Sequence, residues 1–367
     1  MKRCKIKDIC DKGSSSLKQK ELLESGEFEV YGASGVAGYL NEYHQSKEYI
    51  GIVKDGSGIG RVAFYPPNTS LIGTMQYILP KNGYNIRYIG YCLQSLDLSK
   101  YKQGAAIPHI YFRDYGEMQV HITDDIQEQQ QIVSYLDSSL AHIDELKANA
   151  EKQLNDAKAL FQKALEKAME PKEGWEEKKI GEVCEIARGG SPRPIKAFIT
   201  TEKNGLNWIK IGDTDPQGKY IYETKEKIKP EGLKKSRWVE ENEFLLSNSM
   251  SFGRPYILKT NGCIHDGWLV LRDYQHCLNI DFFYYLLISP EVQAQFRTKA
   301  QGSTVSNLNT DRVSTTLICF PSLSEQQQIV TRLDSLSANI KALEENLEKT
   351  ISECDALKQA LLREVFE

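Results

Sequence analysis

Apolar residues recur in alternating steps of three and four positions along two long stretches of the chain. The first stretch includes Val133, Leu136, Leu140, Ile143, Leu154 and Phe161, and Lys147 is the polar residue in its seam. The second includes Val330, Leu333, Ile340, Leu347, Ile351 and Leu361, with polar breaks at Ser337, Glu344 and Lys358. Neither stretch contains glycine or proline. A sustained spacing of 3.5 residues predicts two long helices of the coiled-coil type.

The two predicted helices are copies of one another. The hexamer EQQQIV stands at Glu128 to Val133 and again at Glu325 to Val330, 197 positions later, and the likeness continues without a gap for about forty residues. Each apolar seam must be buried, and the other copy is the nearest candidate partner. A coiled coil formed by the two copies is therefore predicted. Two ordinary bundle helices inside one domain are the alternative, although ordinary helices average only ~11–12 residues.

The segments between the helices also resemble each other. KIKDIC (5–10) is similar to KKIGEVC (178–184), and SGIGRVAF (57–64) takes the place of MSFGRPYI (250–257). Both segments hold short β-prone runs such as EYIGIV, MQYIL, NWIKI, FLLS and WLVLR, with turn residues between them and short helices near 86–95 and 281–299. We predict an α+β protein with two pseudo-repeated globular domains, 1–125 and 171–322, separated by long helices at 126–170 and 323–367.

Composition limits the class of protein. Hydrophobic residues make up 40% of the 367 residues and charged residues 26%, which is typical of a soluble globular chain, and no apolar run reaches the ~20 residues that span a bilayer. The eight cysteines form no C-x-x-C pair, and no signal peptide is visible, so reduced thiols and a cytoplasmic location are expected. The net charge of −4 comes from the two repeated segments, and the intervening domains are nearly neutral.

Two similar domains held apart by a rod favour recognition at two places on one elongated partner. DNA has this form. A helix from 133 to 168 is on the order of 54 Å long at ~1.5 Å per residue, which corresponds to roughly 16 base pairs at ~3.4 Å each. Reading such a target needs donors for base edges in the major groove and basic or backbone groups for phosphates.

The repeated arrangement resembles the specificity subunit of type I restriction–modification systems. The segments that carry the resemblance are FPSLSEQQQIVTRLDSL with GSTVSNLN upstream of it, and GWEEKKIGEVCEIARGGSP followed by NWIKIGD. The likeness extends over the whole chain. The first domain departs from the pattern because it has no counterpart of NWIKIGDTDP and has ITDDIQEQQ where the family usually shows prolines.

This resemblance implies a division of labour. Each globular part would be a target recognition domain for one half of a bipartite double-stranded DNA target. The two long helices would form an antiparallel coiled coil that sets the gap between the two halves. The helix pair would dock two adenine-N6 methyltransferase subunits, and a restriction and translocase subunit would join through them. The chain itself would carry no catalytic residue, no metal and no cofactor, because S-adenosylmethionine, ATP and Mg²⁺ belong to the partners.

Candidate DNA contacts lie in polar, glycine-containing segments with basic residues. Glycine permits close approach of backbone N–H groups to a phosphate. Ordinary surface turns and solvated basic residues are the alternative at each place, and Lys210 could equally face the core edge. The candidates are Ser57, Gly58, Gly60, Arg61, Arg188, Gly189, Gly190, Ser191, Arg193, Lys210, Lys234, Lys235, Asn248, Ser249 and Arg254.

Motifs of catalytic chains are weak or missing. YPPN (65–68) is not the N-P-P-Y loop of amino-methyltransferases, and GSGIG (56–60) is neither a P-loop nor G-x-G-x-x-G. Asp215, Glu223 and Lys225 could form a loose nuclease pattern, and CIHD (263–266) could suggest a metal, but successive strand residues alternate faces. A catalytic nuclease or methyltransferase chain and a protein-only coiled-coil adaptor remain the alternatives.

Overall fold

The computed structural model describes residues 1–104, 107–216, 218–248, 252–300 and 307–366. The chain forms two compact units. Unit 1 comprises Met1–Gln153 with Asn346–Glu367, and unit 2 comprises Leu154–Glu345. The two long helices, α4 (Ile126–Met169) and α9 (Leu323–Phe366), each contribute residues to both units.

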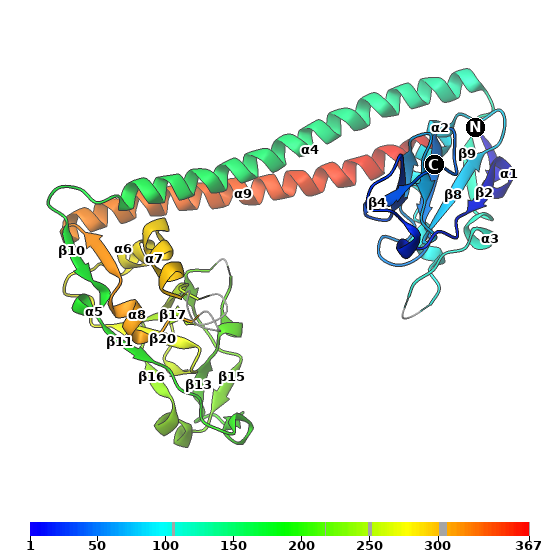
Figure 1. Cartoon of the computed structure of the whole chain (residues 1–367). Coiled ribbons are helices and arrows are strands. Elements are labelled where there is room, and N and C mark those ends of the chain that lie inside the picture. Colours follow the sequence, from blue (N-terminus) through cyan, green and yellow to red (C-terminus); the bar gives the residue numbers. More distant parts are fainter. Residues whose placement is uncertain (105–106, 217, 249–251, 301–306, 367) are drawn as a thin grey trace. The chain divides into compact units, whose positions relative to one another are not determined.

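The β-rich domain of unit 1 is built from short strands. A four-stranded sheet has the order β2-β8-β5-β6, a three-stranded sheet has the order β4-β3-β7, and β1 pairs with β9. Short helices lie between the strands (Figure 1). The elements are β1 (Lys2–Lys5), α1 (Ile6–Ile9), β2 (Cys10–Ser14), η1 (Gln19–Glu21), β3 (Phe28–Gly32), β4 (Gly35–Leu40), β5 (Tyr49–Val53), β6 (Val62–Tyr65), β7 (Ser70–Leu71), β8 (Met75–Pro80), α2 (Ile86–Ser95), η2 (Leu98–Tyr101), α3 (Phe112–Tyr115) and β9 (Gln119–Ile122).

The β-rich domain of unit 2 holds two five-stranded sheets, with the orders β11-β20-β17-β18-β14 and β12-β15-β13-β19-β16, and β10 pairs with β21. Its elements are β10 (Glu176–Lys179), α5 (Ile180–Val183), β11 (Glu185–Arg188), η3 (Ile195–Ala197), β12 (Ile199–Thr200), β13 (Leu206–Ile209), η4 (Ile211–Asp213), β14 (Tyr220–Ile221), β15 (Glu226–Ile228), η5 (Pro230–Lys235), β16 (Arg237–Val239), β17 (Phe244–Ser247), β18 (Pro255–Leu258), β19 (Gly262–Ile264), β20 (Trp268–Arg272), α6 (Ile280–Ile288), α7 (Pro290–Ala300), α8 (Thr310–Ser314) and β21 (Leu317–Phe320).

The two β-rich domains share one arrangement of strands. The order β2-β8-β5-β6 in unit 1 matches β11-β20-β17-β18 in unit 2, and the pairs within both runs are antiparallel. The weak sequence similarity between 5–10 and 178–184 corresponds to a similar local structure. In both copies a single helical turn ends when a cysteine N–H bonds back to an isoleucine carbonyl, Cys10 to Ile6 and Cys184 to Ile180. The predicted internal repeat is therefore confirmed in three dimensions.

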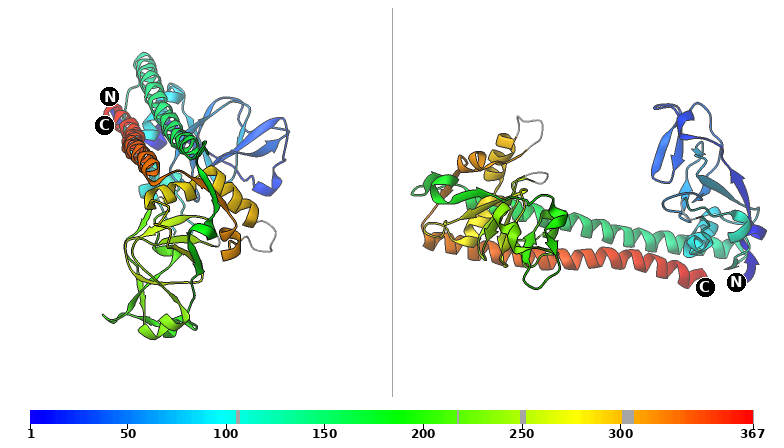
Figure 2. Two further views of the ribbon diagram at one scale, coloured as in Figure 1. Left: turned by 90° about the vertical axis from the view of Figure 1, so that its left-hand side faces the viewer. Right: turned by 90° about the horizontal axis from the view of Figure 1, so that it is seen from below.

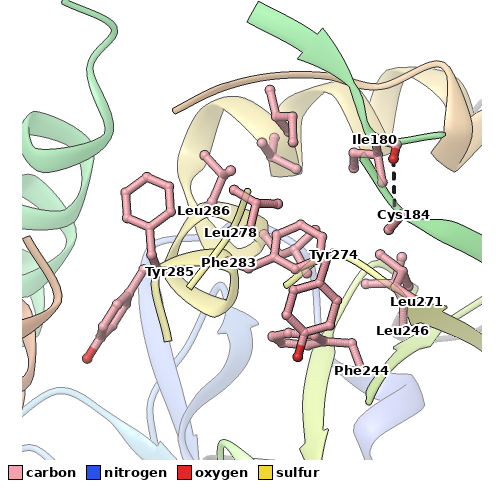
Figure 3. Packing of buried hydrophobic residues seen from close by; sticks show 14 of the residues in the cluster. Ile180, Cys184, Phe244, Leu246, Leu271, Tyr274, Leu278, Phe283, Tyr285 and Leu286 are labelled. Carbon is pink, nitrogen blue, oxygen red and sulfur yellow. Dashed lines mark hydrogen bonds between the residues drawn. The ribbon is translucent and has the colours of Figure 1, made fainter. Parts of the chain in front are cut away.

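The core of unit 2 lies between its sheet and its helices. Phe244 and Leu271 from the sheet meet Tyr274 and Phe283, with the Phe244 and Phe283 rings 5.0 Å apart and nearly perpendicular (Figure 3). The same cluster takes in Leu165 of α4 and Leu333 of α9. Burial of these large side chains, at roughly 1.5–3 kcal/mol each, joins the domain to the long helices.

Within each unit α4 and α9 pack against each other. In unit 1, Leu136 and Leu140 share a cluster with Leu362 and Phe366, and Lys147 forms an ion pair with Asp355 at 2.7 Å. In unit 2, Phe161, Leu165 and Met169 share a cluster with Ile329, Val330 and Leu333. Early residues of one helix therefore meet late residues of the other, which is an antiparallel pairing (Figure 2).

The seam departs from the predicted positions at the helix ends. Continued beyond Phe161, the alternating steps lead to Ala164 and Ala168, but Leu165 and Met169 are the buried residues there. At the end of α9, Leu362 and Phe366 are buried more deeply than Leu361 and Val365. A straight α-helix has 3.6 residues per turn, so its apolar face drifts by ~20° per heptad against a 3.5 repeat. The single helix expected near 281–299 is also wrong, because the chain breaks it at Ser289 and Pro290 into α6 and α7.

Candidate nucleic-acid interface

Several of the predicted contact residues in unit 2 converge on one turn, His265–Gly267 between β19 and β20. Ser191 Oγ donates to Asp266 Oδ1 at 2.6 Å, Arg193 reaches Asp266 Oδ2 at 3.4 Å, and Arg188 Nε donates to the Asp266 carbonyl at 3.1 Å. Asn248 Nδ2 donates to the same carbonyl at 2.8 Å. Asp266 therefore organises the loop 188–193 and the end of β17 into one surface.

The glycines of the loop 188–193 are required by close packing. A Cβ on Gly189 would lie 2.2 Å from the His265 carbonyl oxygen, and one on Gly190 would lie 2.7 Å from the Lys235 carbonyl oxygen. Arg237, which sequence reasoning missed, donates from Nε to the Arg188 carbonyl at 2.7 Å. The glycines thus bring the loop against the segment 235–237 and gather basic side chains.

Two titratable groups at the turn have shifted pKa values. The hydrogen bond from Ser191 holds the pKa of Asp266 below its usual range, with smaller contributions from His265 and Arg193. Burial lowers the pKa of His265, which lies between the rings of Trp208 and Trp268. At neutral pH the turn therefore carries a carboxylate beside a neutral imidazole. Arg188 and Arg237 donate from Nε to backbone carbonyls.

The remaining candidates in unit 2 differ in their surroundings. The Arg254 guanidinium lies 5.4 Å from the centre of the Tyr256 ring, half-buried, directly before β18. Lys210 is engaged by Glu226 at 2.7 Å. Lys234 and Lys235 are exposed at the end of η5, with Lys235 Nζ 5.9 Å from the Phe198 ring centre. Ser249 lies outside the described residues.

Arg61 in unit 1 occupies the place that Arg254 occupies in unit 2. Each follows a glycine in the left-handed region, with φ of 83° at Gly60 and 80° at Gly253, and each leads into the last strand of the shared four-strand order, β6 or β18. Ser57 and Gly58 are exposed in the loop that joins β5 to β6, and the Arg61 side chain donates to the Ala33 carbonyl. The loop is the hairpin connection between the antiparallel strands β5 and β6.

A groove of about 750 Å³ lies beside this loop within unit 1. Its walls come from the loop 58–62, from α2, and from the C-terminal end of α9, and they include Arg61, Arg87, Lys358 and Arg363. Arg87 forms an ion pair with Asp137, with 3.6 Å between Arg87 Nε and Asp137 Oδ1. Sequence reasoning missed Arg87 and Arg363 because only folding places them near Arg61.

A second missed segment follows from the matched sheets. In the shared register, β2 ends at Ser14 where β11 ends at Arg188. The segment 14–19, with Lys18 in it, is therefore the counterpart of the loop 188–193. Its composition, SSSLKQ, carries no glycine or arginine that would have marked it in the sequence.

Other kinds of site find little support. Among the residues that the structure describes, there is no group of three or more His, Cys, Asp or Glu side chains that could hold a metal ion. The Lys225 side chain of the loose nuclease pattern donates to the Gly212 carbonyl at 2.9 Å. Over the described ranges, every helix is too short or too polar to cross a membrane.

The family model for the type I restriction modification DNA specificity domain matches residues 1–156 and 172–353. The chain belongs to this family. Members are non-catalytic specificity subunits, so the chain is a DNA specificity subunit of a type I restriction–modification system.

Solved structures share the fold of this specificity subunit. A chain from a structure on complex assembly and conformational transition of the type I R-M system is 18% identical, with a TM-score of 0.76, and the match covers 98% of this chain and 96% of that one. The HsdS subunit from Thermoanaerobacter tengcongensis is also 18% identical, with a TM-score of 0.58 over 98% and 95% of the two chains. The predicted family and fold class are confirmed.

Proposed function

We propose that residues 1–125 and 171–322 are two target recognition domains that read the two halves of a bipartite double-stranded DNA target. The support is the matched strand order combined with different loops. Equivalent positions hold Ser14–Gln19 in one domain and the basic loop 188–193 in the other. Two similar scaffolds with different loops suit two half-sites of different sequence. Contacts to phosphates fix the position of a protein on the duplex, whereas contacts to base edges determine which sequence it reads.

We further propose that the reading surface of the second domain is centred on the turn 265–267. Arg188, Arg193 and Arg237 would supply phosphate or guanine contacts. Asn248 is buried, and its amide would hold the turn in place through the Asp266 carbonyl. Arg61 and Arg254 would serve at equivalent places in the two domains. Asp266 would hold the loop 188–193 in position. Its carboxylate would also repel a phosphate that came close to it.

The segments 126–170 and 323–367 would act as the spacer between half-sites. Two methyltransferase subunits would dock on this helix pair, and a restriction and translocase subunit would be recruited through them. S-adenosylmethionine, ATP and Mg²⁺ would then be bound by those subunits, in the cytoplasm. The observation that carries this proposal is the duplication itself, since two equivalent surfaces suit two copies of one partner.

The experiment combines the purified chain with the methyltransferase subunit of its own system. Methylation of adenine at one bipartite sequence is expected only when both proteins are present, together with a footprint on both half-sites. Methylation or cleavage by this chain alone would overturn the proposal in favour of an enzyme. Absence of any footprint with both proteins present would overturn it in favour of a protein-only adaptor.

A further inference from the structure

Charged residues interrupt the apolar seam of the long helices, and in unit 1 they pair across it. Lys147 Nζ lies 2.7 Å and 2.8 Å from the two carboxylate oxygens of Asp355. Asp144 is paired with Lys358 one turn away. Lys147 and Lys358 are the better shielded partners, with side chains 27% and 24% exposed. Each pair has one member on α4 and one on α9.

The repeat gives every one of these residues a counterpart 197 positions away. Glu344 stands on α9 where Lys147 stands on α4, and Lys158 stands on α4 where Asp355 stands on α9. The charge has been inverted at both positions. An antiparallel pair of α4 with α9 therefore sets Lys147 against Asp355 and, by the repeat, Lys158 against Glu344.

A pair of like helices in the same register would have the opposite electrostatics. Two copies of α4 would set Lys147 against Lys158 twice. Two copies of α9 would set Glu344 against Asp355 twice and Lys341 against Lys358 twice. Much of the apolar seam is the same in both helices, because Val133, Leu136 and Ile143 have the apolar counterparts Val330, Leu333 and Ile340. Leu140 and Phe161 differ, since their counterparts are Ser337 and Lys358.

We propose that the charges at 147, 158, 344 and 355 select the pairing of α4 with α9 and reject the pairing of either helix with its own copy in a second chain. Such devices are known from coiled coils, where charges beside an apolar seam set the choice of partner. The consequence is that each α4 is paired with an α9, because pairing of two like helices would bring like charges together.

The test uses the full-length chain with Lys147→Glu and Asp355→Lys, singly and together. Each single change sets like charges face to face in the native pair and is expected to lower the melting temperature. The double change restores an attractive native pair, so the melting temperature returns to that of the unaltered chain. It also makes the like pairs attractive, because the new carboxylate at position 147 would face Lys158 and the new ammonium group at position 355 would face Glu344.

Discrimination is measured by refolding each chain from denaturant at a series of concentrations and determining the dimer fraction by sedimentation velocity. The double variant is expected to form about tenfold more dimer than the unaltered chain at equal concentration, the sum of several contacts changed from repulsive to attractive. Lys349→Glu with Glu353→Lys is the matched control, because that exposed pair lies on one helix. A dimer fraction equal to the unaltered chain, or a double variant whose melting temperature is not restored, would overturn the proposal.

Discussion

The side-chain oxygen of Gln129 accepts a hydrogen bond from the backbone N–H of Asn85 at 2.7 Å, and Gln326 does the same for Asn279 at 2.8 Å. Both glutamines belong to the repeated hexamer and both are fully buried. Asn85 and Asn279 are themselves the N-caps of α2 and α6. The hexamer is thus repeated because each copy fastens the start of a domain helix to the start of a long helix.

Gln129→Leu and Gln326→Leu should each destabilise the unit that contains the substitution. Gln129 also donates to the Thr123 carbonyl at 2.9 Å, so leucine leaves a buried donor and a buried acceptor without partners. The cost expected is about 1–3 kcal/mol for each group left unsatisfied. Thermal unfolding measures this loss. Gln130→Ala, at an exposed position in the same hexamer, is the control, and equal losses in both variants would contradict the assigned role.

Arg193→Ala should weaken DNA binding without affecting folding. Its side chain is 79% exposed and reaches Asp266 only at 3.4 Å, so little of the native packing depends on it. Loss of one phosphate contact should lower the slope of log affinity against log salt by about 1. Fluorescence anisotropy over a salt series, with the methyltransferase present, measures the slope. Lys167→Ala on α4 is the control variant and should leave the slope unchanged. A slope that is equally unchanged in Arg193→Ala would show that Arg193 makes no phosphate contact.

Arg254→Ala should weaken DNA binding and lower stability only slightly. The guanidinium stacks on Tyr256, an interaction of about 0.5–1 kcal/mol at such half-exposed sites, whereas a base-edge or phosphate contact is worth about 1–3 kcal/mol. Arg254→Lys keeps the charge but not the planar fork, and should recover part of the binding. Binding and melting curves for both variants separate the two roles. A large fall in melting temperature with unchanged affinity would show that Arg254 is structural.

Asp266 should make the stability of unit 2 depend on acid pH. The pKa of this carboxyl is lowered in the folded state, chiefly by the Ser191 hydrogen bond, so its contribution is present above the unfolded pKa of ~3.9 and is lost as the pH falls through the folded pKa. Asp266→Asn should lower the melting temperature at pH 7, and the difference from the unaltered chain should shrink below about pH 4. Melting curves from pH 3 to pH 7 check this. A difference that stays constant with pH would contradict it.

The sequence predicted the scaffold better than the site. Long periodic helices and runs such as MQYIL and WLVLR carry their pattern locally, and β8 and β20 form where those runs lie. The helix start at Gln129 was visible only as a repeat, because its partner Asn85 is distant in the chain. The interface depends on long-range contacts, such as Arg237 with Arg188 and Ser191 with Asp266, which no local motif records.

Two features of unit 2, a helix break and an ion pair between strands, could not be read from the local sequence pattern. Pro290 has no backbone N–H and starts a new helix, so α6 and α7 are separate although the apolar pattern continues. Lys210 remains a predicted DNA contact, and Glu226 on the neighbouring strand β15 pairs with its ammonium group at 2.7 Å. Strand pairing decides such a contact, and the sequence does not reveal the strand order.

We expect the paired helices α4 and α9 to fix the distance between the two half-sites. The most direct test inserts one heptad into α4 after Ala150 and one into α9 after Ile351, keeping the apolar seam in register, and determines the methylated adenine motif in cells that carry the complete system. Seven residues lengthen each helix by ~10.5 Å. We therefore expect the gap between the two half-sites to grow by about three base pairs, with both half-site sequences unchanged. An unchanged gap, with methylation retained, would contradict it.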